Sequence, residues 1–165
     1  MVYWHCEHHR SDTMTTTRRI QFSIDIAAPV PTVFRWMLDD DGYRHWTQPF
    51  AEGSHFVGQW KAGEQIRFQG PNGDGMLSEI AELRPDEYVS IRHLGYIQQG
   101  VVDTESEAVR AWAPAYENYH FHATPAGTRV VVDQDATPEF ETYLREAWPK
   151  ALQQLKALCE ARVVG

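Results

Sequence analysis

Histidines and carboxylates at strand-like spacings are the residues of this 165-residue chain that could do chemistry. His93 follows Val89 and Ile91 at every second position, and alternate residues of a strand point to the same face. Because Val and Ile favour the interior, we expect His93 to point inward with them. A neutral histidine in an apolar cavity can hold a ligand carbonyl or act as a general base. It can equally be a core histidine bonded to a polar neighbour, and the pattern leaves both interpretations open.

Three glutamates, Glu64, Glu79 and Glu117, lie within strand-like segments. A buried carboxylate needs a partner or a raised pKa, because burial of a charge is costly. Glu79 shares parity with Leu77, so it is the carboxylate that we expect in a cavity, although Ile80 interrupts the alternation and indicates a β-bulge or a shifted strand. A pair of Glu79 with His93 would supply an acid and a base, as in a cyclase- or hydratase-like enzyme.

The remaining histidines raise the question of a metal site. His120 and His122 are predicted on the outward face of a strand with Asp133 nearby, which resembles half of such a site. The segment 4–9 also gathers three histidines and Cys6, but a second anchoring half is missing. We therefore predict no metal and no cofactor.

The elements that must position these residues follow from apolar spacing. Ile20, Phe22, Ile24 and Ile26 alternate with polar residues, which predicts a half-buried first strand beginning at Arg18. Prolines 29 and 31 precede one apolar helical face, and a short second helix or turn carries Tyr43 to Trp46. Further strands are predicted over 54–60, 64–69, 75–83, 87–94, 115–124 and 128–136.

Two longer segments complete the pattern. The polar stretch from Gln98 to Pro114 exceeds an ordinary hairpin connection, which is typical of a lid or mobile loop. A long amphipathic helix begins after Thr137 and Pro138, and it is the element large enough to cover the apolar face of an antiparallel sheet. The predicted class is therefore α+β, a helix-grip in which a curved antiparallel sheet wraps around a long C-terminal helix.

Short motifs spread over residues 18–160 carry a family resemblance. They are Ile26–Pro29, Val33–Phe34, Trp46, Gly58–Gly63, Gly75–Ile80, Gly127–Val131, Trp148, Leu152 and Leu155. In these motifs the chain resembles the START-like (SRPBCC) superfamily, which includes the birch-pollen allergens and polyketide cyclases. Within it, the chain is similar to the branch related to the activator of the heat-shock-protein-90 ATPase.

This resemblance implies a small hydrophobic ligand, aromatic or lipid-like, held between the sheet and the C-terminal helix. It also implies an alternative, a co-chaperone-like activator with a chaperone as partner. Trp46 and Trp112 lie beside loops and are expected near the cavity mouth. The residues predicted to contact the ligand are Phe34, Trp46, Phe68, Leu77, His93, Tyr119, Trp148 and Leu152.

Composition narrows the function classes. The net charge is −8 with no basic block, so nucleic acid and anionic membrane surfaces are poor partners for this chain. No stretch approaches the roughly 20 apolar residues of a membrane helix. Two cysteines near opposite ends do not form a disulfide framework, which favours a cytoplasmic location. We expect a flexible leader over residues 1–17 and one START-like domain over 18–165.

Overall fold

The computed structural model describes residues 17–161, so the expected leader lies outside the described residues except for Thr17. Strand β1 (Arg18–Ile26) shows the predicted alternation, with Ile20 and Ile26 buried and the residues between them more exposed. Helix α1 (Val30–Leu38) carries a proline in its first turn, where a missing N–H costs no hydrogen bond. Helix α2 (Asp40–Trp46) follows at once, with two aspartates at its positive end.

The strands after α2 form one open antiparallel sheet with β1. Its order is β1-β8-β7-β5-β4-β3-β2, and β6 pairs with β5 off this path. The register pairs Ile26 of β1 with Thr128 of β8, and His93 of β5 with Ala115 of β7. The strands are β2 (His55–Gly58), β3 (Gln65–Gln69), β4 (Gly75–Arg84), β5 (Tyr88–Gln98), β6 (Val101–Asp103), β7 (Ala115–Thr124) and β8 (Gly127–Ala136).

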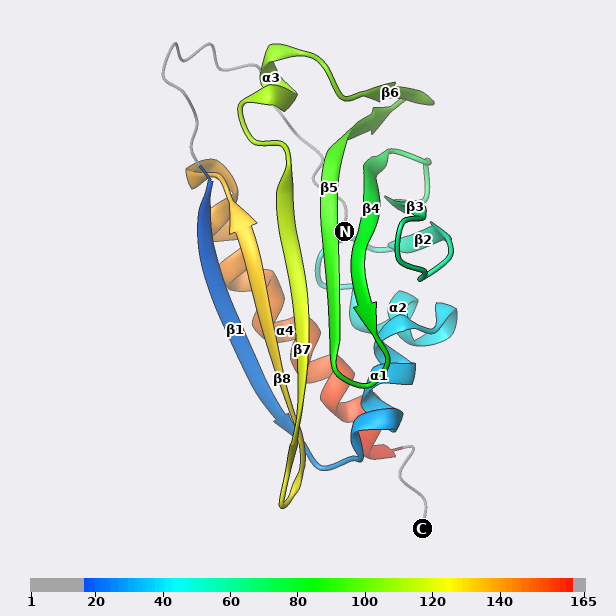
Figure 1. Ribbon diagram of the computed structural model, residues 1–165, viewed down its shortest axis with the longest axis vertical. Coiled ribbons are helices and arrows are strands. Elements are labelled where there is room, and N and C mark those ends of the chain that lie inside the picture. The colour runs from blue at the N-terminus through cyan, green and yellow to red at the C-terminus, as the bar shows by residue number, and fades with distance from the viewer. Residues whose placement is uncertain (1–16, 162–165) are drawn as a thin grey trace.

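Helix α4 (Pro138–Ala161) lies against one face of the sheet, behind β1, β8 and β7 in Figure 1. Its buried side chains recur at helical spacing, so one stripe of the helix covers the apolar face of the sheet. This arrangement confirms the predicted α+β helix-grip fold. The buried residues are Leu144, Ala147, Trp148, Ala151, Leu152, Leu155 and Cys159.

Aromatic side chains fill the space between sheet and helices. Trp148 of α4 and Trp46 of α2 are both fully buried, with ring centroids 5.7 Å apart. Each indole N–H donates a hydrogen bond, Trp46 to the carbonyl of Met37 and Trp148 to the Gln134 side chain. Large rings contribute much of the apolar area that a core buries, and their packing leaves little room at the centre of this fold.

The stretch predicted as a lid has structure of its own. Residues 99–114, here named the flap, contain β6 and the short helix α3 (Glu107–Arg110). Ser106 caps α3 by accepting a hydrogen bond from the Val109 N–H, and Asp103 accepts from the Ser106 N–H. Gly95 of β5 allows the flap to lie close to this strand, because a Cβ at position 95 would be only 2.0 Å from the Asp103 carbonyl oxygen.

Candidate ligand-binding pocket

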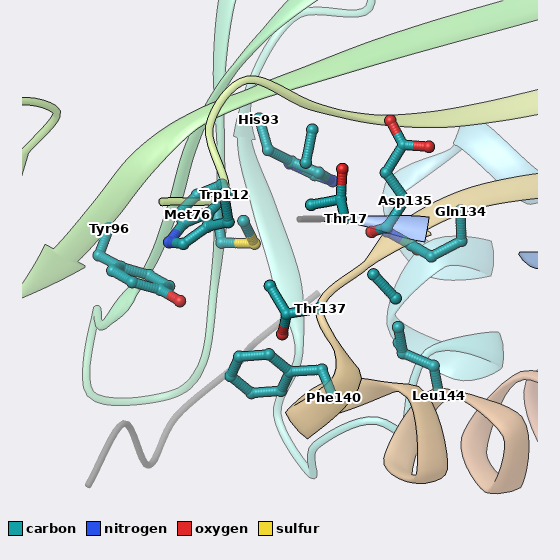
Figure 2. A pocket seen from close by; sticks show the side chains of 12 residues that line it. Thr17, Met76, His93, Tyr96, Trp112, Gln134, Asp135, Thr137, Phe140 and Leu144 are labelled. Atoms are coloured by element: carbon teal, nitrogen blue, oxygen red, sulfur yellow. The ribbon is translucent and has the colours of Figure 1, made fainter. Parts of the chain in front are cut away.

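A small pocket lies at the end of the grip where β8 leads into α4, and the flap is at the same end of the molecule (Figures 1 and 2). Its volume is about 30 Å³, well below that of an ordinary small-molecule site. The walls are mostly apolar, which is typical of a site for small molecules. The lining residues are Thr17, Met76, His93, Tyr96, Trp112, Ala115, Gln134, Asp135, Ala136, Thr137, Phe140 and Leu144.

His93 reaches the pocket from β5 and is held by two strands beside it. Its Nδ1 lies 2.7 Å from the Ser78 hydroxyl of β4, and its Nε2 lies 3.2 Å from Oε1 of Glu117 on β7. All three residues are almost fully buried. Register explains the grouping, because Ser78 stands directly opposite His93 and Glu117 is opposite Ile91, on the same face of the sheet.

Glu117 also accepts a hydrogen bond from the Tyr119 hydroxyl, so its two oxygens serve two donors. None of the ion pairs among the described residues joins Glu117 to a lysine or arginine. Burial, and then the nearby Glu117 carboxylate, raise the pKa of Tyr43 well above its ordinary value. We define the buried network as Ser78, His93, Glu117 and Tyr119. Both ring nitrogens of His93 are engaged inside it, so this imidazole presents no free nitrogen to a ligand.

Glu79 lies on the other face of the sheet and bonds to Arg92 at 2.8 Å. The inward residues of β4 are its neighbours Ser78 and Ile80, both fully buried. The register between β4 and β5 shifts at Leu77/Ser78 and again after Ile80, as the interrupted alternation indicated. The predicted pair of Glu79 with His93 is therefore not formed, and Glu117 is the carboxylate that contacts this histidine.

The family model of the Activator of Hsp90 ATPase homolog 1-like proteins (AHSA1) matches residues 27–160. The chain belongs to this family. The match covers the structure from the end of β1 to the end of α4. No curated protein matches the chain in sequence at a significant level.

Solved structures share the fold of this AHSA1-like chain at low identity. A protein from Mesorhizobium loti is 14% identical with a TM-score of 0.69, covering 89% of this chain and 100% of its own. The Aha1 dimer from Colwellia psychrerythraea is 20% identical with a TM-score of 0.68, covering 89% and 99%. The AHSA1-like protein from Aeromonas hydrophila is 16% identical with a TM-score of 0.62, covering 87% and 93%.

The eight residues predicted to contact a ligand are spread over this AHSA1-like fold. His93 is the one among them that lines the pocket. Phe34 is half-buried against Phe121, and Leu77 lies in a hollow on the outer face of the sheet beside Arg92. The other five, Trp46, Phe68, Tyr119, Trp148 and Leu152, are buried in the core.

Residues that the sequence reasoning did not select also build the site. Glu117 has the same strand parity as Tyr119 and Phe121. The alternation that predicts an inward Tyr119 therefore predicts an inward Glu117 as well. Ser78 shares its strand parity with Met76 and Ile80, which also point inward, so these two apolar neighbours carried the signal for Ser78. Trp112, expected at a cavity mouth, does line the pocket.

His120 and His122 lie on the outer face of β7, with parallel rings 6.1 Å apart. His120 Nε2 is 2.9 Å from the Asp133 carboxylate. Although burial acts in the opposite direction, hydrogen bonds from Gln21 and His120 lower the pKa of Asp133. Within residues 17–161 no group of three or more histidine, cysteine or acidic side chains is arranged to hold a metal ion, and the segment 4–9 lies outside these residues. Within the same range, no helix has both the length and the apolar character needed to cross a membrane.

Proposed function

We propose that this protein binds a small, largely apolar molecule in the pocket between the sheet, the start of α4 and the flap. The observation that carries the proposal is the apolar lining, to which Met76 of β4 and both Phe140 and Leu144 of α4 contribute. Apolar walls with a few polar groups are the usual composition of small-molecule sites. Because the core behind the pocket is filled by aromatic rings, we place the ligand at this end of the grip.

A ligand of ordinary size requires the flap to move, because the pocket is small. Trp112 of the flap contacts Tyr96 of β5 with ring centroids 4.9 Å apart, and both residues line the pocket. The flap joins the sheet through the three residue pairs of β6 with β5, while Val101 and Val102 remain exposed. Displacement of Trp112 with the flap would enlarge the pocket, and it would also move Val109, the buried residue of α3.

In this arrangement His93 contacts the ligand through the carbon edge or face of its ring, since both nitrogens are engaged. Trp46, Phe68, Tyr119, Trp148 and Leu152 would form the rigid wall behind it. The free thiol of Cys159 is buried, so we also propose a reducing, cytoplasmic location.

The experiment has two parts, native mass spectrometry of freshly purified protein and a titration with the neutral fluorescent naphthalene ketone prodan. Ala115 lines the pocket, and Ala123 is an exposed residue of the same strand. Ala115→Leu should weaken prodan binding about tenfold by filling the pocket, whereas Ala123→Leu should leave it unchanged. Thermal unfolding verifies that both variants are folded. If prodan does not bind, or binds both variants alike, the proposal is wrong.

A second candidate function is stimulation of the Hsp90 ATPase, and the family match over residues 27–160 favours it. It is tested by a pull-down with Hsp90 and by the ATPase rate with and without this protein. Absence of both binding and stimulation would remove this candidate. The enzymatic alternative, a cyclase- or hydratase-like reaction using His93 and Glu79, loses its basis because these side chains face opposite sides of the sheet.

A further inference from the structure

The charge of the pocket lining restricts which ligands it can take. The twelve lining residues include no lysine and no arginine, and the acidic one among them is Asp135. The Glu117 carboxylate lies directly behind His93. The Asp135 carboxylate is already paired with Arg19, so this arginine is not free for a ligand. An anionic headgroup would therefore enter an apolar space with the Glu117 carboxylate nearby and no free cation in the lining, and burial of an unpaired charge is strongly unfavourable.

Most polar groups of the lining already have partners. His93 is bonded to Ser78 and Glu117. The Gln134 amide accepts from Trp148 and donates to the Asp135 carbonyl. These side chains have little hydrogen-bonding capacity left for a ligand.

Two polar atoms of the lining are buried without a hydrogen-bond partner among the described residues, Nε1 of Trp112 and Oγ1 of Thr137. Thr137 is 8% exposed and stands where β8 passes into α4. Trp112 comes from the flap and lies beside Met76 in Figure 2. Folded proteins rarely leave buried donors unpaired, because an unmade hydrogen bond is costly.

The chemistry of these two groups defines what would satisfy them. An indole N–H can only donate, so its partner must be an acceptor, and the threonine hydroxyl can donate to a second acceptor position. A carbonyl or ether oxygen provides such acceptors without bringing a charge.

We propose that the pocket selects neutral ligands that carry an acceptor oxygen, such as a ketone, ester or amide, and that Trp112 Nε1–H and the Thr137 hydroxyl donate to it. This inference rests on the proposed function and adds the ligand class. Carboxylates of similar size, fatty acids included, are excluded by the same lining.

Three naphthalenes of similar size test the selection by competing with bound prodan: 2-acetylnaphthalene, 2-ethylnaphthalene and 2-naphthoate. The ketone should compete about tenfold better than the hydrocarbon, the equivalent of about 1.4 kcal/mol, and the carboxylate should compete least. Trp112→Phe and Thr137→Val should each reduce the preference for the ketone in part, and the double variant should reduce the affinity for the ketone to that for the hydrocarbon.

Trp60→Phe is the matched control, because the Trp60 N–H is also buried without a partner among the described residues but lies outside the pocket. It should leave the ketone preference unchanged. Equal competition by the three naphthalenes, or a ketone preference that is unchanged in Trp112→Phe or survives in the double variant, would overturn this inference while prodan binding still upholds the proposed function. Failure of prodan to bind overturns both.

Discussion

The imidazole Nε2 of His93 lies 3.2 Å from Oε1 of Glu117, and the two side chains are only 1% and 3% exposed. A buried carboxylate needs compensation, and here it comes from two hydrogen-bond donors, His93 and Tyr119. The simplest proton arrangement has Nε2–H donating to Glu117 and the Ser78 hydroxyl donating to Nδ1. Such a network holds β4, β5 and β7 together beneath the pocket.

Glu117→Ala should lower the free energy of unfolding by about 1–3 kcal/mol, because it removes the carboxylate that accepts from two buried donors, His93 and Tyr119. Glu117→Gln should cost less, since its amide oxygen still accepts one hydrogen bond. Urea denaturation measures both. Glu79→Ala is the control on the outer face, where loss of the solvent-screened ion pair with Arg92 should change the free energy of unfolding little. Equal losses for Glu117→Ala and Glu79→Ala would contradict this role of the buried network.

Trp148→Ala should destabilise the fold by about 3–5 kcal/mol, because Trp148 is fully buried and packs on Trp46 and Phe50. The comparison is Trp36→Ala, a half-buried residue of α1 for which we expect a smaller loss. Urea denaturation followed by far-UV circular dichroism reports both values. A small loss for Trp148→Ala would mean that this tryptophan borders an open cavity instead of filling the core.

The flap should loosen in acid. Hydrogen bonds from Ser106 and then Glu105 lower the pKa of Asp103 below its ordinary value of 3.8. A lowered pKa stabilises the folded flap above the ordinary value, and this stabilisation is lost as the pH falls through the lowered value. Amide-exchange protection of the Ser106 and Val109 N–H groups should therefore be constant near neutral pH and fall below pH 3.8.

Asp103→Ala should show reduced protection already at neutral pH. Glu105→Ala, which removes a neighbouring exposed carboxylate of the same flap, should behave as the native chain. Unchanged protection in Asp103→Ala would show that Asp103 does not hold the flap.

Cys159 should be almost inert towards thiol reagents in the folded protein. Burial, and to a lesser extent Glu160, raise the pKa of this thiol to about 12, so little thiolate exists at pH 8. In a Cys6→Ser variant, Cys159 should react with Ellman's reagent on the order of a hundredfold more slowly in buffer, where the protein is folded, than in urea. Rapid native labelling would show that the end of α4 opens readily.

The fold could be predicted from the sequence because its elements are regular. The alternation of Ile20 to Ile26 and the apolar stripe of the C-terminal helix each follow a single period, and each forms as expected. The predicted loop after β5 is more ordered than expected, because the three-residue β6 and the one-turn α3 are too short to leave a periodic pattern.

The site was less predictable for a different reason. Glu79 does share a face with Leu77, but Leu77 lies on the outer face of the sheet, and the inward residues of this segment are Met76, Ser78 and Ile80. The pocket is small because Trp46 and Trp148 pack against each other, a contact between residues far apart in sequence. Such contacts depend on how the helices pack against the sheet. The spacing of residues along one segment does not predict this packing.

Strand β5 carries His93 in the pocket and Gly95 beneath the flap, and the bulged residue Leu94 lies between them, since His93 and Gly95 pair with the consecutive residues Ser78 and Leu77. The proposed site and the support of the flap are therefore adjacent parts of one strand. For a ligand in this pocket, occupancy and closure are linked equilibria. A molecule that binds more tightly beneath a closed flap must favour closure by the same factor.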